Sequence, residues 1–253
     1  MDQSADLPVG WRAASFEEID STNSEALRRA ASGERGPLWI TARFQSKGRG
    51  RSGRSWTSAE DSLAATLLLE PGCSSQDLPQ LSLVAGVAAH DAIAGVLPAE
   101  GRARTRLKWP NDVLIDGAKV TGILVESSIL GSCLIAVIGT GINVSAAPAL
   151  EGRATMSLRQ CGASVNSGAM SIRLAQALAR WIGEWQGGRR FDRVRSAWLE
   201  RAGSLGEPMS IRVTGERIAG RFAGLDTDGA LLLDTGRGRP RRFTFGDVAL
   251  GVT

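Results

Sequence analysis

The alternation of apolar and polar positions along the first 145 residues predicts a series of strands with two helices between them. The strand segments are rich in large apolar and β-branched residues; they are 10–20, 37–44, 62–70, 105–109, 113–128 and 133–145. The segment 113–128 carries the turn Asp116-Gly117 near its start and therefore predicts a hairpin. Helical spacing begins at Ser21 and recurs over about 78–97.

The first predicted helix has start and stop signals. Thr22 and Glu25 have the spacing of a capping box, and Gly33 lies where a C-terminal cap is expected. Taken alone, the run Ser21, Thr22 and Asn23 is explained by capping. A cap can also border a ligand, so we expect Thr22 to cap the helix while Ser21 and Asn23 face a cavity.

The last third of the chain has a different pattern. Residues 147–168 are irregular, and two helices are predicted at about 170–186 and 191–202, with tryptophans spaced for core packing. Short alternating strands separated by Gly-rich turns then predict a small barrel. Strands mixed with helices and then followed by them indicate an α+β main domain. We predict a catalytic domain at 1–203 and a barrel at 204–253.

Composition narrows the class of protein. Of 253 residues, 43% are hydrophobic and 22% charged, which is ordinary for a soluble globular chain. The opening residues lack the pattern of a signal peptide, and no apolar run approaches the roughly 18 residues of a membrane span. The cysteines Cys73, Cys133 and Cys161 lack metal or redox spacing, so we expect a reduced cytoplasm. A single histidine leaves little scope for histidine-based catalysis.

The charge of the chain is positive but dispersed. The formal net charge is +4, and arginine outnumbers lysine 27 to 3. In a chain with so few lysines, a lysine indicates a position where a compact ammonium group serves better than a guanidinium. The three lysines, Lys47, Lys108 and Lys119, all fall in the stretches with candidate chemistry.

Four stretches place polar, charged or glycine residues at the ends of predicted strands: DSTN (20–23), FQSKGRGRSGRSW (44–56), KWPNDVLIDGAKVTGILVE (108–126) and GTGINVS (139–145). The second carries four cationic side chains, no acid and three interleaved glycines. Such a run is either a disordered arm on nucleic-acid phosphates or a loop over one small phosphorylated ligand. Two closely flanking strands and a single aromatic, Trp56, favour the loop.

Taken together and in this order, the four stretches resemble the signatures of the biotin–protein ligase family, whose members join biotin to a lysine of a carrier protein using ATP. The loop matches the run GRGRxGRxW, and KWPND, GILVE and GTGINV match the other signatures. The resemblance runs from about residue 12 to the C-terminus. It implies a class II synthetase-like mixed sheet with an SH3-like barrel. Some members carry an N-terminal DNA-binding domain, and we expect none here because DSTN begins at residue 20.

The resemblance implies a biotin site built mainly from short polar side chains and glycines. Burying the ureido group of biotin without partners would cost roughly 1–3 kcal/mol per unsatisfied group. The glycines would let the backbone approach the biotin rings, although a strand glycine can also mark a bulge. The implied biotin-binding residues are Ser21, Thr22, Asn23, Gln45, Gly48, Arg49, Arg51, Lys119, Gly122, Gly139 and Gly141.

The reaction that the resemblance implies brings a carboxylate against ATP, which is repulsive without compensating cations. We expect the arginine loop to neutralise both reactants and to close over the reactive product, with Gly48, Gly50 and Gly53 supplying positive φ or close approach. Trp56 either covers the adenylate or anchors the strand. The implied ATP-binding residues are Arg51, Arg54, Trp56, Asn111, Lys119 and Asn143.

Lys119, Arg51 and Asp112 are the candidate catalytic residues. Lys119 would place an ammonium between the carboxylate and the α-phosphate. Asp112 would orient Lys119, help to hold Mg²⁺ or assist the incoming amine, and the sequence does not choose among these roles. The residues that would bind Mg²⁺ stay unassigned. Glu126 is a weaker candidate of the same kind. Ser52 departs from the family pattern, since some members carry a further arginine there.

Two other functions compete with biotin ligation. A lipoate or octanoate ligase or transferase of related fold is disfavoured by the pair GRGRSGRSW and KWPND, and a non-enzymatic nucleic-acid binder is disfavoured by the loop context. The expected ligands are biotin, ATP and Mg²⁺. The expected partner is a biotin carboxyl carrier domain of acetyl-CoA carboxylase or a related carboxylase, docked near an exposed sheet edge. Sheet edges also make dimers, so a homodimer stays open.

Overall fold

A seven-stranded mixed sheet forms the centre of the larger part of the molecule, in a computed structural model that describes residues 6–251. In spatial order the strands are β1 (Arg12–Ile19), β2 (Leu38–Gln45), β3 (Leu63–Leu69), β7 (Cys133–Ile142), β6 (Ala118–Leu130), β5 (Asp112–Ile115) and β4 (Thr105–Lys108). β1 pairs with β2 in parallel and the other neighbours are antiparallel, so the predicted mixed sheet is confirmed.

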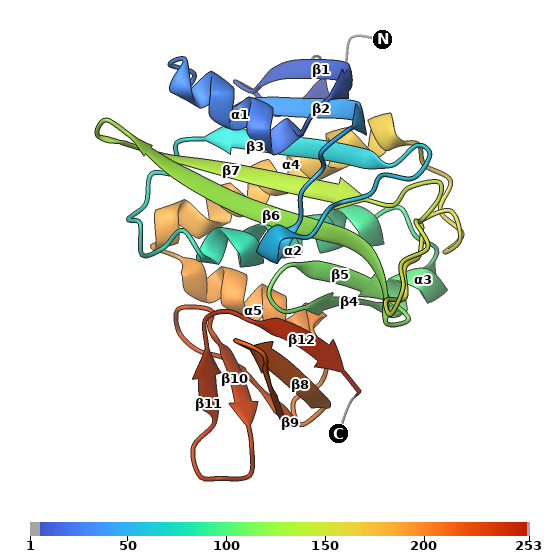
Figure 1. The fold of residues 1–253 in the computed structure, drawn as a ribbon, viewed down its shortest axis with the longest axis vertical. Coiled ribbons are helices and arrows are strands. Elements are labelled where there is room, and N and C mark those ends of the chain that lie inside the picture. The colour runs from blue at the N-terminus through green and yellow to red at the C-terminus, as the bar shows by residue number, and fades with distance from the viewer. Residues whose placement is uncertain (1–5, 252–253) are drawn as a thin grey trace.

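Helices cover both faces of this sheet (Figure 1). α1 (Thr22–Ala31) packs on β3 and β7 on one face, whereas α2 (Gln80–Ala94), α4 (Ser167–Trp185) and α5 (Phe191–Arg201) form a layer on the other. The structure also contains the short helix α3 (Ala99–Ala103) and the single turns η2 (Arg51–Gly53) and η3 (Gln186–Gly188). The sequence did not predict α3, because one turn is too short to show helical periodicity.

Burial explains why these segments take these places. All seven residues of β3 are buried, as expected for a strand with covered faces, and Leu67 and Leu68 are fully inaccessible. Each such leucine stabilises the fold by about 1.5–3 kcal/mol. Trp185 and Trp198 are fully buried and Trp181 is partly buried, which confirms their predicted packing role.

The first turn of α1 corrects one prediction. The N-cap is Ser21 and not Thr22, since Ser21 has extended backbone angles and its Oγ accepts from the backbone N–H of Ser24 at 3.5 Å. Thr22 is the first helical residue, and its side chain turns to Gln45 instead. Gly33, with a φ of 99°, follows the last turn of the helix as predicted.

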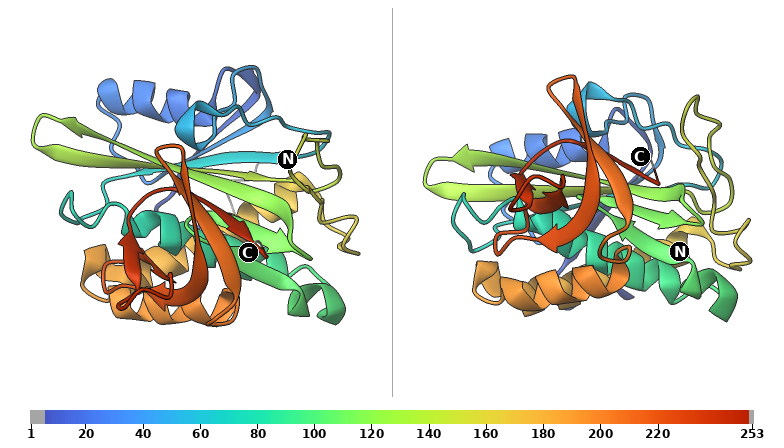
Figure 2. Two further views of the ribbon diagram at one scale, coloured as in Figure 1. Left: turned by 60° about the horizontal axis from the view of Figure 1, so that its bottom comes forward. Right: turned by 90° about the horizontal axis from the view of Figure 1, so that it is seen from below.

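A second, five-stranded antiparallel sheet follows α5. Its order is β11 (Arg241–Phe243), β10 (Leu231–Asp234), β9 (Glu216–Leu225), β8 (Pro208–Val213) and β12 (Asp247–Leu250). Figure 1 shows this small sheet beneath α5 and the β4–β5 end of the large sheet, and the views of Figure 2 bring it to the front. It agrees with the small C-terminal β unit that the sequence predicts.

The two sheets share one apolar core. The rings of Trp198 in α5 and Phe222 in β9 meet edge to face at 6.4 Å, and Trp109 Nε1 donates to the Gly229 carbonyl at 3.1 Å. The division into 1–203 and 204–253 stays a prediction. Within residues 6–251, no helix combines the length and apolar character that crossing a membrane requires.

Candidate active site

One cavity lies where β2, β5, β6 and β7 approach the small sheet. Its free volume is about 120 Å³, well below the roughly 300–1,000 Å³ typical of ligand pockets. Residues 49–51 and 54–57 of the loop 46–62, which we call the flap, line one side of the cavity.

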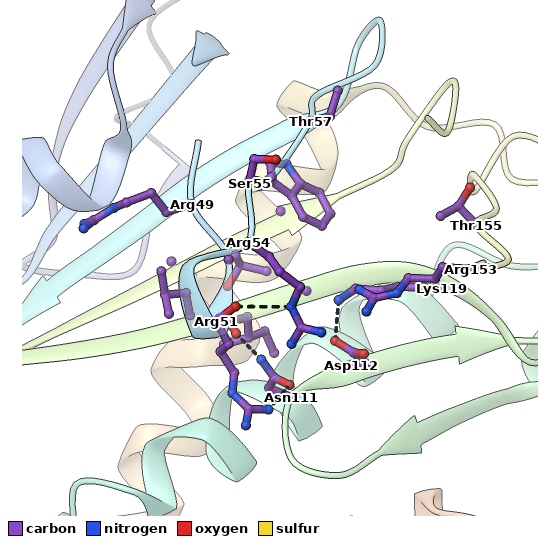
Figure 3. A pocket seen from close by; sticks show the side chains of 18 of the residues that line it. Arg49, Arg51, Arg54, Ser55, Thr57, Asn111, Asp112, Lys119, Arg153 and Thr155 are labelled. Carbon is purple, nitrogen blue, oxygen red and sulfur yellow. Dashed lines mark hydrogen bonds and ion pairs between the residues drawn. The ribbon is translucent and has the colours of Figure 1, made fainter. Parts of the chain in front are cut away.

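The structure brings most of the predicted site residues together around this cavity. Those that line it are Ser21, Thr22, Gln45, Arg49, Arg51, Arg54, Trp56, Asn111, Asp112, Lys119, Gly122, Gly139, Gly141 and Asn143. Asn23 and Gly48 are not in its lining. Figure 3 shows Asn111 beside Arg51, and Asp112 and Lys119 together, with the Arg54 side chain extending toward them.

A chain of polar side chains closes the α1 end of the cavity. The backbone N–H and Oγ1 of Thr22 both donate to Gln45 Oε1, at 2.9 and 3.1 Å. Thr66 Oγ1 lies 2.8 Å from Thr22 Oγ1 and 2.7 Å from Asn23 Oδ1. Asn23 Nδ2 donates to Glu126 Oε2 at 2.8 Å. Asn23, predicted to bind biotin, thus holds Thr66 and Glu126 in place. The sequence did not indicate Thr66, a buried polar residue in an otherwise apolar strand, as part of this chain.

The flap has a defined hairpin-like form. The Gly50 N–H donates to the Arg54 carbonyl at 2.7 Å, and the Trp56 N–H donates to the Gly48 carbonyl at 2.9 Å. Gly53 has a φ of 73°, and a Cβ on Gly48 would lie 2.6 Å from a backbone oxygen, so both need glycine. The expectation for Gly50 was wrong, because it has an ordinary φ of −117° and room for a Cβ.

Each flap arginine is held by a different part of the molecule. Arg49 pairs with Glu126 at 3.0 Å, and Arg54 pairs with Asp247 of the small sheet at 2.7 Å. Arg51 donates to Asn111 Oδ1 at 3.0 Å and to the Gly246 carbonyl at 3.2 Å. Burial lowers the pKa of Arg51. All three cations thus have oxygen partners that an anionic ligand could replace.

A buried acid holds two lysines in the floor of the cavity. Asp112, 7% exposed, lies 2.6 Å from Lys119 Nζ and 3.2 Å from Lys108 Nζ. Burial alone would raise the pKa of Asp112, but the two ammonium groups outweigh it and hold the pKa below its ordinary value. Burial lowers the pKa of Lys119, and the nearby charges of Arg153 and Lys108 add to this effect.

Local folding explains the position of Lys119. The turn before it has Asp116 at φ 52° and Gly117 at φ 77°, the two left-handed residues of a tight hairpin. The Lys119 N–H then donates to the Ala154 carbonyl at 2.8 Å, and the Met156 N–H donates to the Lys119 carbonyl at 3.0 Å. These bonds fix the backbone of Lys119 on both sides.

The side-chain amide nitrogens of two asparagines donate hydrogen bonds to backbone carbonyls. Asn111 Nδ2 donates to the Ile123 carbonyl, which leaves its Oδ1 for Arg51. Asn143 Nδ2 donates to the carbonyls of Lys119 and Met156, at 3.4 and 3.3 Å. Its buried Oδ1 has no partner within residues 6–251. Asn143 therefore offers an acceptor, which suits a nucleotide hydroxyl or amino group better than a phosphate.

The glycines of β6 and β7 make room for side chains. A Cβ on Gly141 would lie 2.3 Å from the Trp56 ring, and one on Gly122 would lie 3.2 Å from it. A Cβ on Gly139 would lie 2.1 Å from the Asn23 amide. The indole of Trp56 thus lies against Gly122 and Gly141, which were predicted to contact biotin. The indole must therefore move if biotin is to reach these glycines.

Sequence reasoning missed several groups that line the cavity. Lys108 was noted only as a retained lysine, and Arg153 falls in a stretch that was expected to be irregular. Gly246 and Asp247 come from the small sheet, more than 100 residues away from their arginine partners in the flap. No local pattern announces such contacts, because they depend on how the two sheets pack.

Comparison with known proteins places these features in a family. The model of the biotin/lipoate A/B protein ligase family matches residues 15–143, and that of the biotin protein ligase C terminal domain matches residues 204–251. The biotin–[acetyl-CoA-carboxylase] ligase of Paracoccus denitrificans is 42% identical over 227 residues, covering 87% of this chain and 93% of the relative. The Mycobacterium tuberculosis protein of the same name is 33% identical over 256 residues, covering 98% and 92%.

A solved structure shows the same fold. The biotin protein ligase from Aquifex aeolicus in complex with biotin and ATP superposes with a TM-score of 0.78 at 25% identity, covering 96% of this chain and 99% of that one. A likeness over nearly the whole of both chains includes the small sheet as well as the large one.

Proposed function

This chain belongs to the biotin/lipoate A/B protein ligase family, and we infer that it is an ATP-dependent biotin–protein ligase. It activates biotin to biotinyl-5′-AMP and transfers the biotin to a lysine of a biotin carrier protein. The single observation that best supports this reading is the meeting of the Lys119–Asp112 pair and the flap arginines around one cavity.

We propose that biotin lies at the α1 end of the cavity. The ureido group of biotin offers two N–H donors and one carbonyl acceptor. Ser21, Thr22 and Gln45 present hydroxyl and amide groups of matching type there. Trp56 would have to move from Gly141 for the rings to reach the sheet, and that movement would accompany opening of the flap.

In the first step, an oxygen of the biotin carboxylate attacks the α-phosphorus of ATP, and the bond from that phosphorus to the bridging oxygen breaks. Pyrophosphate leaves with the electron pair. We propose that Lys119 lies between the two anions and that Arg51 neutralises the phosphate. Because Lys119 is already fixed beside Asp112 in a partly desolvated site, it stabilises the transition state with little reorganisation.

In the second step, the neutral amine of the carrier lysine attacks the acyl carbon, the bond from that carbon to the phosphate oxygen breaks, AMP leaves with the electron pair, and the proton that the amine loses passes to water. Asp112 is poorly suited to accept that proton, because two ammonium groups hold its pKa low. We therefore assign Asp112 the orientation of Lys119. The carrier domain of acetyl-CoA carboxylase is the proposed acceptor, since the relatives carry that enzyme in their names.

Mg²⁺ has no preformed site in the part of the chain that the structure describes. No group of three or more His, Cys, Asp or Glu residues could hold a metal there, and Asp112 is already compensated by two lysines. We propose that Mg²⁺ enters with the triphosphate, as is common for this ion. A cytoplasmic location is a further proposal, and the choice between monomer and homodimer stays open.

The test is incubation with ATP, Mg²⁺, labelled biotin and a biotin carrier domain. We expect biotin-dependent release of pyrophosphate and transfer of the label to the carrier. A parallel reaction with lipoate should release none, which separates this function from lipoate ligation. Activity with lipoate alone, or binding of nucleic acid that weakens steeply with salt and no ATP turnover, would replace the proposal.

A further inference from the structure

The flap is attached to the rest of the molecule at both of its ends. At its start, the backbone N–H groups of Ser46 and Lys47 donate to the carbonyls of Ile19 and Asp20, at 2.9 and 2.8 Å. At its other end, Asp61 lies two residues before β3. Between the two ends, the flap is held by the arginine contacts described above. The contacts of Asp61 therefore decide where the second end of the flap lies.

The carboxylate of Asp61 binds two segments outside the flap. Ser145 Oγ donates to Asp61 Oδ2 at 2.6 Å, and Ser167 Oγ donates to Asp61 Oδ1 at 2.5 Å. The Ser167 backbone N–H also donates to Oδ1, at 3.4 Å. Arg159 Nη2 donates to Ser145 Oγ at 2.7 Å, which places a cation behind the serine. We call these four residues, Asp61, Ser145, Arg159 and Ser167, the Asp61 anchor.

Charge and backbone conformation both suit an aspartate at this position. Burial alone would raise the pKa of Asp61, but the hydrogen bonds from Ser145 and Ser167 outweigh burial and hold the pKa below its ordinary value. Ser167 begins α4, whose first turn contains no acid, so the carboxylate also faces the positive end of that helix dipole. The φ of Asp61 is 51°, a left-handed conformation that Asp and Asn adopt more readily than most residues.

The partners of Asp61 belong to a segment that forms another part of the cavity lining. Ser145 follows the cavity residue Asn143 by two positions, and the Arg159 N–H donates to the Val144 carbonyl at 3.0 Å. The same segment contributes Pro148, Leu150, Arg153 and Thr155 to the lining. The anchor therefore joins the second end of the flap to the wall that carries Asn143. Asp61 itself is not in the lining, so any effect on a ligand acts through the flap and this wall.

We propose that Asp61 is a positioning residue for adenylate formation: its carboxylate fixes the second end of the flap to the cavity wall, so that the flap arginines approach the ligand from a defined place. This inference deepens the proposed function and rests on it. The exposed pairs of Arg49 and Arg54 exchange easily, whereas the short bonds of Asp61 are charge-assisted. A fixed end reduces the conformational freedom that ligand binding has to remove.

Three variants of the full-length protein test the anchor. Asp61→Gly removes the carboxylate and still permits the left-handed backbone, which alanine would strain. Asp61→Asn keeps the side-chain shape and one acceptor oxygen but removes the charge. Ser167→Ala removes one bond from the wall side and leaves the flap sequence unchanged, while Asn166 remains the N-cap of α4.

Asp77→Gly is the matched control. The Asp77 carboxylate accepts from Ser74 Oγ at 2.8 Å and from Gln80 Nε2 at 3.0 Å, in a loop outside the flap and the cavity lining. Two quantities are measured for each protein. The first is the rate of trypsin cleavage within the flap of the ligand-free protein, with fragments identified by mass spectrometry. The second is the pair of kcat and KM for ATP in biotin-dependent release of pyrophosphate.

We expect Asp61→Gly to speed cleavage after the flap arginines by about tenfold or more, since hydrogen bonds to a charged group are lost. The KM for ATP should rise in the same direction. The kcat should change by less than about twofold, because saturating ligand selects the flap position in which the arginines contact it. Asp61→Asn should fall between the parent protein and Asp61→Gly, and Ser167→Ala should change the same quantities in the same direction. The control should match the parent protein in both measurements.

Three results would overturn the role of Asp61. The first is a cleavage rate and a KM that are equal in the parent protein and Asp61→Gly. The second is an equal effect in Asp77→Gly, which would mean a general loss of stability. The third is a fall in kcat with an unchanged KM, which positioning of the flap does not explain. A parent protein that releases no pyrophosphate with biotin would refute the proposed function, whereas trypsin cleavage of the ligand-free variants would still decide whether Asp61 holds the flap.

Discussion

The floor and the flap both bring positive charge to one cavity, but the protein holds the two sets of charges in opposite ways. In the floor, Lys108 and Lys119 are mostly buried around one buried acid, on strands of the central sheet. In the flap, the side chains of Arg49 and Arg54 are 44% and 40% exposed, and their acids come from other elements. The floor charges are fixed, whereas the flap charges can exchange partners.

This difference suggests a division of labour between the two regions. An incoming anion can take Arg49 and Arg54 from Glu126 and Asp247, because surface ion pairs contribute only about 0–1 kcal/mol. Lys119 can turn to the same anion without leaving Asp112 uncompensated, because Lys108 stays beside that acid. The floor would provide a prearranged charge, and the flap would provide charge that arrives with the ligand.

Asp112→Ala should give the largest effect on stability. It leaves two ammonium groups facing each other in a mostly buried site, and breaking such a pair costs about 3–5 kcal/mol. Urea unfolding of the ligand-free protein measures this change. Arg54→Ala is the matched flap variant and should cost no more than about 1 kcal/mol. Equal losses from the two variants would erase the distinction between floor and flap.

Lys119→Ala should keep the fold and lose adenylate formation by roughly 10²- to 10³-fold, the usual effect of removing one group that stabilises transition-state charge. The fold survives because Asp112 keeps Lys108 at 3.2 Å. Biotin-dependent release of pyrophosphate measures the activity, and the thermal midpoint checks the fold. Turnover near the parent rate would remove Lys119 from the chemistry.

The strands of the central sheet were predictable from the sequence because each alternates or clusters apolar residues between clear turn signals. The N-cap was misassigned because Ser21 and Thr22 are both good caps, and only the direction of the Thr22 side chain toward Gln45 separates them. Lys108 and Lys119 are mostly buried and line the cavity, and their functional role stays a prediction. Lys47, by contrast, is exposed and lies outside the cavity lining.

The site could be located from motifs, but its internal contacts could not. A motif names residues and not their partners, so nothing in GRGRSGRSW indicates that Arg54 pairs with Asp247, which lies 193 residues away. Gly122, Gly139 and Gly141 were predicted to let the backbone approach biotin, and in the structure Trp56 and Asn23 are the groups that lie against them. Such details depend on tertiary packing, which a local pattern does not encode.

Arg51→Ala should lower adenylate formation by about 10²-fold, at the lower end of the range for such groups. Arg51 is the most firmly placed of the flap arginines, with neutral partners in Asn111 and Gly246, so its loss leaves no acid unpaired. Circular dichroism should show that the fold is retained. Single-turnover formation of the adenylate separates this effect from carrier transfer, and an unchanged first step would contradict the role given to Arg51.

The pH dependence of kcat/KM for adenylation should also distinguish the floor from the flap. The pKa of Lys119 is lowered by burial, so kcat/KM for adenylation should be full below that pKa and fall as pH rises through it, below the ordinary lysine value of about 10.4. Between those two values the unfolded chain holds the proton and the folded protein does not, so this group makes the free energy of unfolding rise with pH.

Lys119→Arg provides the control for this pH profile. A guanidinium stays charged, so the variant should be slower at every pH but should lose the alkaline limb that Lys119 causes. If the limb stays in place, another group titrates there.

Glu126→Gln should have the smallest effect, and its sign is informative. The variant keeps an acceptor for Asn23 but removes the charge that competes with a ligand for Arg49. We therefore expect the combined binding of biotin and ATP to tighten by a few-fold, because the exposed pair contributes at most about 1 kcal/mol. Unfolding stability should change by a similar amount or less. Binding that weakens by tenfold or more would mean that Glu126 contacts the ligand or its cation directly, and exchange of partners could not then explain how this flap arginine is used.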